Sequence, residues 1–164
     1  MKRSFESLSP IEVLALAVHV ERANAGRFRA FADVFRGYDA KVTSRFEELA
    51  AEEQEHEARL VAVLERLVGG PVPTVEEAEV EGVIESVDMD DPEHLIFDSM
   101  KPNRVYELAL MAERGARDFY RRAAAASRDA ELVALYSELA DLERDHEEWL
   151  ENRLKQENRS SGGV

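Results

Sequence analysis

The chain has 164 residues, enough for one domain with a sizeable hydrophobic core. Its formal net charge of −14 argues against nucleic acid as a partner, because the phosphates would be repelled. It contains no cysteine, which excludes disulfides, iron–sulfur clusters, thiolate zinc sites and a rubredoxin-type iron centre within the chain.

The first residues show no targeting pattern. Met1–Glu6 is followed by no unbroken apolar stretch of the kind that a secretory signal needs. The apolar run Val13–Val20 ends at Glu21, and no run approaches the roughly twenty apolar residues of a membrane-spanning helix. We therefore expect a soluble protein without a membrane span, and the absence of cysteine fits a cytoplasmic location.

Helical periodicity begins at a well-marked start. Ser9-Pro10-Ile11-Glu12 is a capping box with proline at the first helical position, and the helical pattern continues to about Gly37. A second helix is expected from Asp39, a good N-cap, to Val68, where Gly69-Gly70-Pro71 stops it. The loop between the two helices is short, which predicts an antiparallel hairpin.

A long connection separates this hairpin from the next helix. It covers about 70–102, carries prolines and a run of acidic residues, and is unusually long for a compact domain. Such a connection is expected where the chain must cross the length of a helical bundle. Within it, Val72–Val87 could be a strand or an irregular arm, and Asp91–Phe97 could form a short helix.

A second helical hairpin follows the connection. Its first helix is expected over about 103–126, and its second begins after a cap at Ser127 or Asp129 and reaches about Gln156. Residues 159–164 are expected to form a disordered tail. Two hairpins joined by one long crossover predict an all-α protein, with a ferritin-like four-helix bundle over residues 1–158.

The two halves resemble each other closely enough to indicate an internal duplication. Leu49–Glu57 aligns with Leu139–Glu147, and each segment contains a Glu-x-x-His motif, Glu53-Gln54-Glu55-His56 and Glu143-Arg144-Asp145-His146. The upstream helices repeat one spacing, Ala17–Glu21–Phe28–Ala32 and Ala109–Glu113–Tyr120–Ala124. Positions three apart share a helix face, so the carboxylate and imidazole of each motif can bind one metal ion together.

The duplication also selects two glutamates in the upstream helices, Glu21 and Glu113. Both have apolar neighbours, where a carboxylate is unfavourable unless it is paired or coordinated. With the two motifs they supply the carboxylates and imidazoles of a di-iron or di-manganese bundle, for which zinc could compete. The expected metal ligands are Glu21, Glu53, His56, Glu113, Glu143 and His146. Glu53 and Glu143 are expected to bridge two ions. Glu21 with His56 would then complete one ion and Glu113 with His146 the other, although the spacing alone leaves open which of these glutamates joins which histidine.

These motifs resemble those of the rubrerythrin family within the ferritin-like superfamily: Ala-x-x-x-Glu before an aromatic residue, then Glu-x-x-His, with both repeated. The opening Phe5–Ala17 is also similar to the erythrin-like domain at the front of some membrane-bound ferritins. Two features depart from the family. The chain lacks a cysteine-ligated rubredoxin domain, and Leu110 and Ala116 flank Glu113 where many members carry a second glutamate. The ligand set is therefore closer to the ferritin type.

The resemblance implies redox chemistry on two bound iron ions, with manganese or zinc as substitutes. The implied activity is oxidation of Fe(II) with reduction of O₂ or H₂O₂, a ferroxidase- or peroxidase-type reaction in iron homeostasis or oxidative-stress defence. The alternative is a non-catalytic module that binds or delivers iron to a storage or transport assembly, and a scaffold without metal chemistry is a third possibility. Relatives in the family pair, so a homodimer is expected.

Other side chains near the motifs have expected roles too. Tyr120 and Tyr106 could donate a hydrogen bond to a ligand carboxylate. Tyr120 is favoured because its spacing from Glu113 puts both on one helix face, and core packing is the alternative. The remaining glutamates beside the motifs are expected to be solvated: Glu52, Glu55, Glu57, Glu147 and Glu148.

Overall fold

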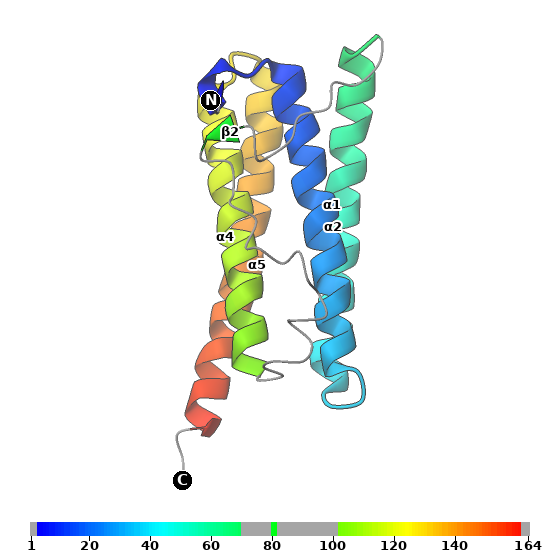
Figure 1. The fold of residues 1–164 in the computed structure, drawn as a ribbon, viewed down its shortest axis with the longest axis vertical. Helices are drawn as coiled ribbons and strands as arrows, with labels where there is room; N and C mark the ends of the chain where they lie inside the picture. Colours follow the sequence, from blue (N-terminus) through cyan, green and yellow to red (C-terminus); the bar gives the residue numbers. More distant parts are fainter. Residues whose placement is uncertain (1–2, 70–79, 82–101, 162–164) are drawn as a thin grey trace.

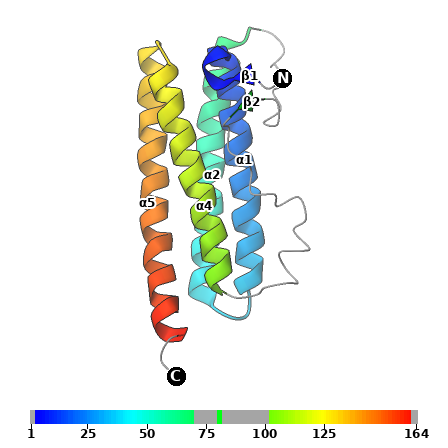
Figure 2. The same cartoon turned by 60° about the vertical axis from the view of Figure 1, so that its left-hand side comes forward.

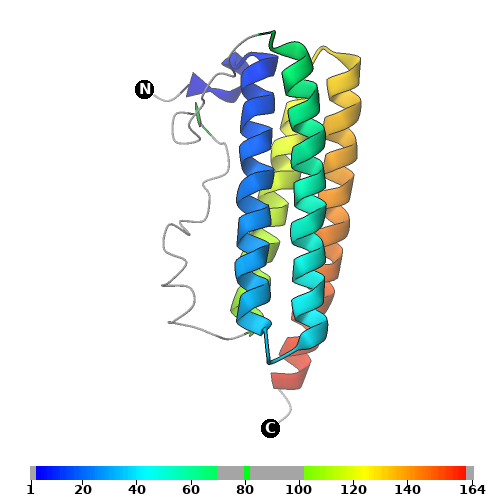
Figure 3. The same ribbon diagram turned by 90° about the vertical axis from the view of Figure 1, so that its right-hand side faces the viewer.

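The structure, a computed structural model, describes residues 3–69, 80–81 and 102–161. In these ranges four long helices run side by side: α1 (Pro10–Phe35), α2 (Ala40–Leu67), α4 (Pro102–Ala126) and α5 (Ala130–Ser161). α1 packs along α2, and α4 packs along α5. Figure 3 views the α1–α2 hairpin from the front with the α4–α5 hairpin behind it. The predicted all-α four-helix bundle is confirmed.

The direction of the helices requires a long connection between the hairpins. α2 ends at the end of the bundle where α1 begins, whereas α4 begins at the opposite end (Figures 1 and 2). The chain between α2 and α4 therefore joins opposite ends of the bundle, as predicted. Within Val72–Val87 the strand β2, Val80–Glu81, is described, and it pairs in parallel with β1, Arg3–Ser4. The helix expected at Asp91–Phe97 lies outside the described residues.

Side-chain caps begin three of the helices. Before α1, the short 3-10 helix η1 (Phe5–Ser7) leads into the predicted capping box: Ser9 Oγ accepts from Glu12 N at 3.3 Å, and Glu12 Oε2 accepts from Ser9 N at 2.8 Å. Asp39 caps α2 by accepting two backbone N–H bonds. Asp129 does the same for α5, at 2.8 and 3.2 Å, which decides between the two predicted caps.

The last helix is longer than the sequence predicts. α5 continues to Ser161, beyond the expected end at Gln156 and into the segment expected to be disordered. Asn103 on α4 donates to Asn158 Oδ1 at 2.8 Å, which ties the end of α5 to the neighbouring helix. Ser160 Oγ also donates to the carbonyl oxygen of Gln156 at 3.1 Å. Both contacts involve exposed side chains in the last two turns of α5.

The hydrophobic core has two parts, one towards each end of the bundle. One cluster includes Leu14, Leu60 and Phe119, and the other includes Phe28, Phe46 and Leu150. In the second cluster Trp149 packs edge-on against Phe46, with ring centroids 5.8 Å apart. Between the clusters lies a group of buried glutamate and histidine side chains. Across the described ranges, no helix has the length and apolar character needed to cross a membrane.

Candidate metal centre

Each long helix contributes one fully buried carboxylate to the middle of the bundle. Every one of these four glutamates is 0 % exposed: Glu21 on α1, Glu53 on α2, Glu113 on α4 and Glu143 on α5. His56 and His146 lie one turn beyond Glu53 and Glu143 and are 6 % and 4 % exposed. All six lie on the stripes that face the core, so the helical periodicity that buries apolar residues also buries these charged ones.

The two histidine rings face each other across the cluster. Their centroids are 6.1 Å apart, and the ring planes differ by only 14°. His56 Nδ1 lies 3.4 Å from a Glu21 oxygen and 3.7 Å from a Glu143 oxygen. His146 Nδ1 lies 3.3 Å from a Glu113 oxygen and 3.2 Å from a Glu53 oxygen. Each imidazole therefore points one nitrogen at carboxylates from both hairpins.

The donor atoms form two overlapping groups. Within each group all atoms lie within 4.8 Å of one another: Glu21, Glu53, His56 and Glu143 in one, Glu53, Glu113, Glu143 and His146 in the other. Glu53 and Glu143 belong to both groups, as expected of bridging carboxylates. Each remaining glutamate belongs to one group with one histidine. The structure thus joins Glu21 with His56 and Glu113 with His146, a choice that motif spacing left open.

The cluster fits divalent cations. Both oxygens of Glu53, Glu113 and Glu143, and Nδ1 of each histidine, are buried without a hydrogen-bond partner in the described part of the chain. Buried carboxylates without partners are strongly unfavourable, since charge is removed from water without compensation. Four carboxylates carry four negative charges, which two divalent cations would cancel. Oxygen and nitrogen donors without sulfur suit iron or manganese.

The protonation equilibria reflect this crowding. Burial raises the pKa of Glu21 to about 8, and the neighbouring Glu53 carboxylate acts in the same direction. Burial also raises the pKa of Glu113 and of Glu143. For His56, burial alone would lower the pKa, but the Glu21 and Glu53 carboxylates raise it to about 10. Without metal, the cluster therefore retains protons well above the pH at which free carboxyl groups lose them.

Tyr120 contacts one of the clustered carboxylates. Its hydroxyl donates a hydrogen bond to Glu21 Oε1, and the ring is fully buried. The partner is on α1 and not on the helix that Tyr120 shares with Glu113. Tyr106 has no such role, because its hydroxyl accepts from Arg153 at 3.4 Å and its ring stacks on Phe35 in the core.

Glu52 is a functional candidate that the sequence interpretation missed. It was expected to be solvated, yet its Oε2 lies 2.7 Å from His146 Nε2. Its Oε1 accepts from Arg45 at 2.9 Å. The hydrogen bond with His146 is the main reason that the pKa of Glu52 falls to about 2, and Arg45 lowers it further. A carboxylate on Nε2 keeps Nδ1 of the same ring turned toward the cluster.

Glu147 is also buried, contrary to expectation. It is 5 % exposed, and its carboxylate accepts from Arg117 Nη1 at 2.8 Å. Arg114 approaches the same oxygen at 3.5 Å, so two α4 arginines cover this α5 side chain. Glu55 and Glu148, which were expected to be solvated, are exposed.

The two halves of the cluster have different surroundings. By the duplication, the α1 counterpart of Tyr120 is Phe28, which carries no hydroxyl. The α5 counterpart of Glu52 is Leu142, which carries no carboxylate. Hence a tyrosine hydroxyl hydrogen-bonds the glutamate in the Glu21–His56 half. In the Glu113–His146 half a carboxylate hydrogen-bonds the histidine instead. The structure is symmetric in its proposed ligands but not in the side chains that orient them.

The chain is similar to known proteins in sequence and in fold. The family model described as rubrerythrin matches residues 12–93, half of the chain, which include Glu21, Glu53 and His56. An uncharacterized conserved protein from Magnetospirillum magnetotacticum has a similar structure, with a TM-score of 0.72 and 21% identity over 91% of this chain and 95% of that one. A hypothetical protein from Pyrococcus furiosus is similar with a TM-score of 0.69 and 21% identity, over 94% of each chain. At this identity the two structures support the fold alone. No curated protein matches the sequence.

Proposed function

The chain belongs to the rubrerythrin family, and on that premise we propose that it is a di-iron carboxylate protein that oxidises Fe(II) with O₂ or H₂O₂. The main support is the convergence of four buried carboxylates and two imidazoles, in which seven carboxylate oxygens and both Nδ1 atoms have no hydrogen-bond partner in the described ranges. A set of oxygen and nitrogen donors with this balance of charge is suited to two divalent iron ions.

The ligand roles follow from the two overlapping groups of donors. Glu53 and Glu143 would be shared by both iron ions, because they belong to both groups. Glu21 with His56 would complete one coordination sphere, and Glu113 with His146 the other. When bound, the two iron ions supply the electrons that reduce O₂ or H₂O₂.

The remaining side chains would orient the ligands and exclude water. Tyr120 holds the Glu21 carboxylate by a hydrogen bond, and Glu52 holds the His146 ring. The apolar clusters above and below the centre keep bulk water from entering along the bundle axis. Such a dry interior strengthens the attraction between carboxylates and cations.

The alternative is a module that binds or delivers iron without turnover. It is favoured by the absence of cysteine, since the chain contains no rubredoxin-type centre that could feed electrons to a peroxidase reaction. This absence weighs less against Fe(II) oxidation, in which the substrate supplies the electrons. The homodimer and the cytoplasmic location expected from the sequence stay predictions.

The two functions differ in turnover. We expect rapid O₂ or H₂O₂ consumption when Fe(II) is added to the protein, measured with an oxygen electrode or a peroxide assay. His146→Ala removes a ligand from one half of the centre and is expected to reduce the rate to that of Fe(II) in buffer. His19→Ala, at an exposed position on α1, is the matched control and should retain the activity. Tight iron binding with negligible turnover would instead support the delivery module.

Glu52 gives a separate prediction about affinity. Glu52→Ala removes the carboxylate that orients His146 and should weaken metal binding in that half about 10- to 100-fold. The affinity of the half that contains His56 should change little. An anaerobic Fe(II) titration by calorimetry should therefore show a tight phase for that half and a weaker phase for the half that contains His146. Glu55→Ala removes an exposed carboxylate from the same helix and should leave the titration unchanged. An unaltered titration for Glu52→Ala would mean that His146 does not depend on Glu52 for its orientation.

A further inference from the structure

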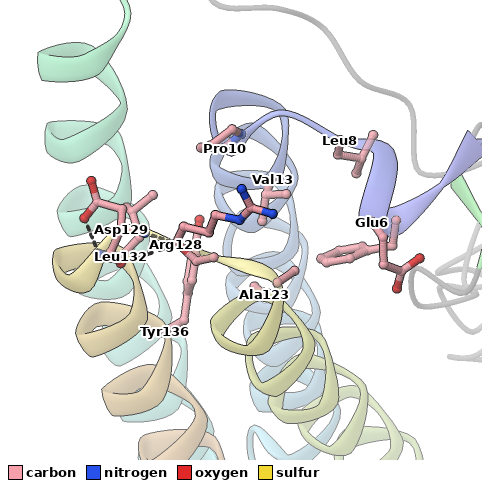
Figure 4. Close-up of a pocket in the computed structure, with 12 residues that line it drawn as sticks. Glu6, Leu8, Pro10, Val13, Ala123, Arg128, Asp129, Leu132 and Tyr136 are labelled. Atoms are coloured by element: carbon pink, nitrogen blue, oxygen red, sulfur yellow. Dashed lines mark hydrogen bonds between the residues drawn. The ribbon is translucent and has the colours of Figure 1, made fainter.

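A pocket lies at the end of the bundle beside the turn between α4 and α5, away from the carboxylate cluster (Figure 4). Its volume is about 530 Å³, which is within the range of small-molecule sites. Apolar side chains from η1, α1, α4 and α5 line it, among them Phe5, Val13, Ala123 and Leu132. Four separate elements therefore build one apolar wall around this space.

Tyr136 brings a polar group to the pocket. The side chain is 1 % exposed, and its hydroxyl has no hydrogen-bond partner among the described residues. Figure 4 shows it farther along α5 from the turn than Asp129 and Leu132. Burial raises the pKa of Tyr136, so the hydroxyl keeps its proton and can donate. A buried hydroxyl without a partner is unfavourable, and a ligand oxygen in the pocket would satisfy it.

Of the charged side chains that line the pocket, Arg128 alone has no ion pair or hydrogen bond with a residue that the structure describes. Glu6 is engaged by Arg122 at 2.7 Å, and the Asp129 carboxylate caps α5. Arg128 forms no ion pair with any residue that the structure describes, and it extends from the turn toward Val13 on α1 (Figure 4). The pocket thus combines an apolar wall, a buried donor and a cation whose charge is not neutralised by the described residues.

We propose that this pocket binds a small carboxylic acid with an apolar body. The carboxylate pairs with Arg128, the apolar body packs against Phe5, Val13 and Leu132, and one ligand oxygen accepts a hydrogen bond from Tyr136. Charge-assisted hydrogen bonds to a guanidinium give such a ligand its preference over a neutral or cationic one. The Tyr136 ring stacks on Tyr120 with centroids 6.1 Å apart, so one layer of aromatic rings separates the pocket from the carboxylate cluster.

The test is a titration of the full chain with benzoate and, separately, with octanoate. Calorimetry measures the affinity and the stoichiometry, and amide chemical shifts locate the binding site. Benzoate represents aromatic acids and octanoate aliphatic acids, so the ligand that binds more tightly shows which class of acid the pocket prefers. We expect saturable binding of one ligand per chain, with chemical-shift changes around the α4–α5 turn. Benzamide and octanamide, which lack the charge, should bind at least tenfold more weakly.

Two variants test the assigned contacts. Arg128→Ala and Tyr136→Phe should each weaken binding, the former about tenfold. Arg121→Ala removes the same charge from an exposed position on α4 that does not line the pocket, and it should bind like the unaltered protein. The proposal is overturned if neither acid binds saturably or if Arg128→Ala binds as tightly as the unaltered protein. Because the titration uses protein without metal, its outcome is independent of the di-iron proposal.

Discussion

Glu143→Leu is expected to abolish the binding of both metal ions and, at the same time, to stabilise the metal-free protein. Glu143 belongs to both donor groups, is 0 % exposed and has two oxygens without a partner in the described part of the chain. Its pKa is raised by burial and by the nearby Glu113, which shows how unfavourable its charge is there. In the metal-free protein Glu143 is a buried polar group without a partner, and replacing buried polar or ionic groups by well-packed apolar side chains of similar size stabilises proteins by about 1–4 kcal/mol in favourable cases.

The two halves of this prediction are measured separately. Metal content after incubation with Fe(II) under anaerobic conditions gives the binding stoichiometry, and thermal unfolding with and without a chelator gives the stability. Glu148→Leu makes the same change at an exposed position on α5 and should retain both the metal and the original stability. A Glu143→Leu protein that still binds two metals would contradict the proposed ligand role. One that unfolds at a lower temperature without metal than the unaltered protein would contradict the expected stabilisation.

The free energy of unfolding of the metal-free protein is expected to fall as the pH rises from about 4.5 to about 8. Over this range Glu21, with its pKa raised from 4.5 to about 8, keeps its proton in the folded protein, whereas the unfolded chain loses it. Each such group lowers the stability by roughly 1.4 kcal/mol per pH unit within its window. Glu113 and Glu143 act in the same direction. His56, raised from 6.5 to about 10, continues the fall at higher pH.

Bound metal should reverse this dependence. Metal ions bind the deprotonated ligands, so they compete with protons and stabilise the folded protein more as the pH rises. Urea unfolding between about pH 5 and about pH 8, with a chelator or with Mn(II), measures both trends. Glu21→Gln should make the metal-free curve less steep, because an amide does not titrate whereas Glu113, Glu143 and His56 still do. A metal-free protein whose stability is constant or rises over this range would show that the carboxylates are not held in a low-dielectric cluster.

The sequence predicts the fold and the six clustered side chains because both depend on short-range regularities. Helical periodicity identifies which face of each helix is buried, and the duplication of Glu21 and Glu53 in Glu113 and Glu143 selects the inward glutamates. The capping box at Ser9 is likewise encoded within four residues. None of these inferences requires knowledge of how one helix is rotated against another.

The features that the sequence did not reveal depend on contacts between helices. Glu52 reaches His146 from another hairpin, and its sequence neighbours do not distinguish it from an ordinary solvated glutamate. Glu147 is buried because arginines on α4 cover it. The last turns of α5 contact α4 through the hydrogen bond from Asn103 to Asn158. Each of these contacts is determined by the packing of the two hairpins and not by local sequence.

The most direct test of the metal centre is anomalous diffraction from crystals of the iron-loaded protein, with data collected on both sides of the iron absorption edge. We expect two peaks inside the bundle, one between Glu21 and His56 and the other between Glu113 and His146, both beside Glu53 and Glu143. The absence of iron from this cluster, or iron found only at the protein surface, would contradict the account.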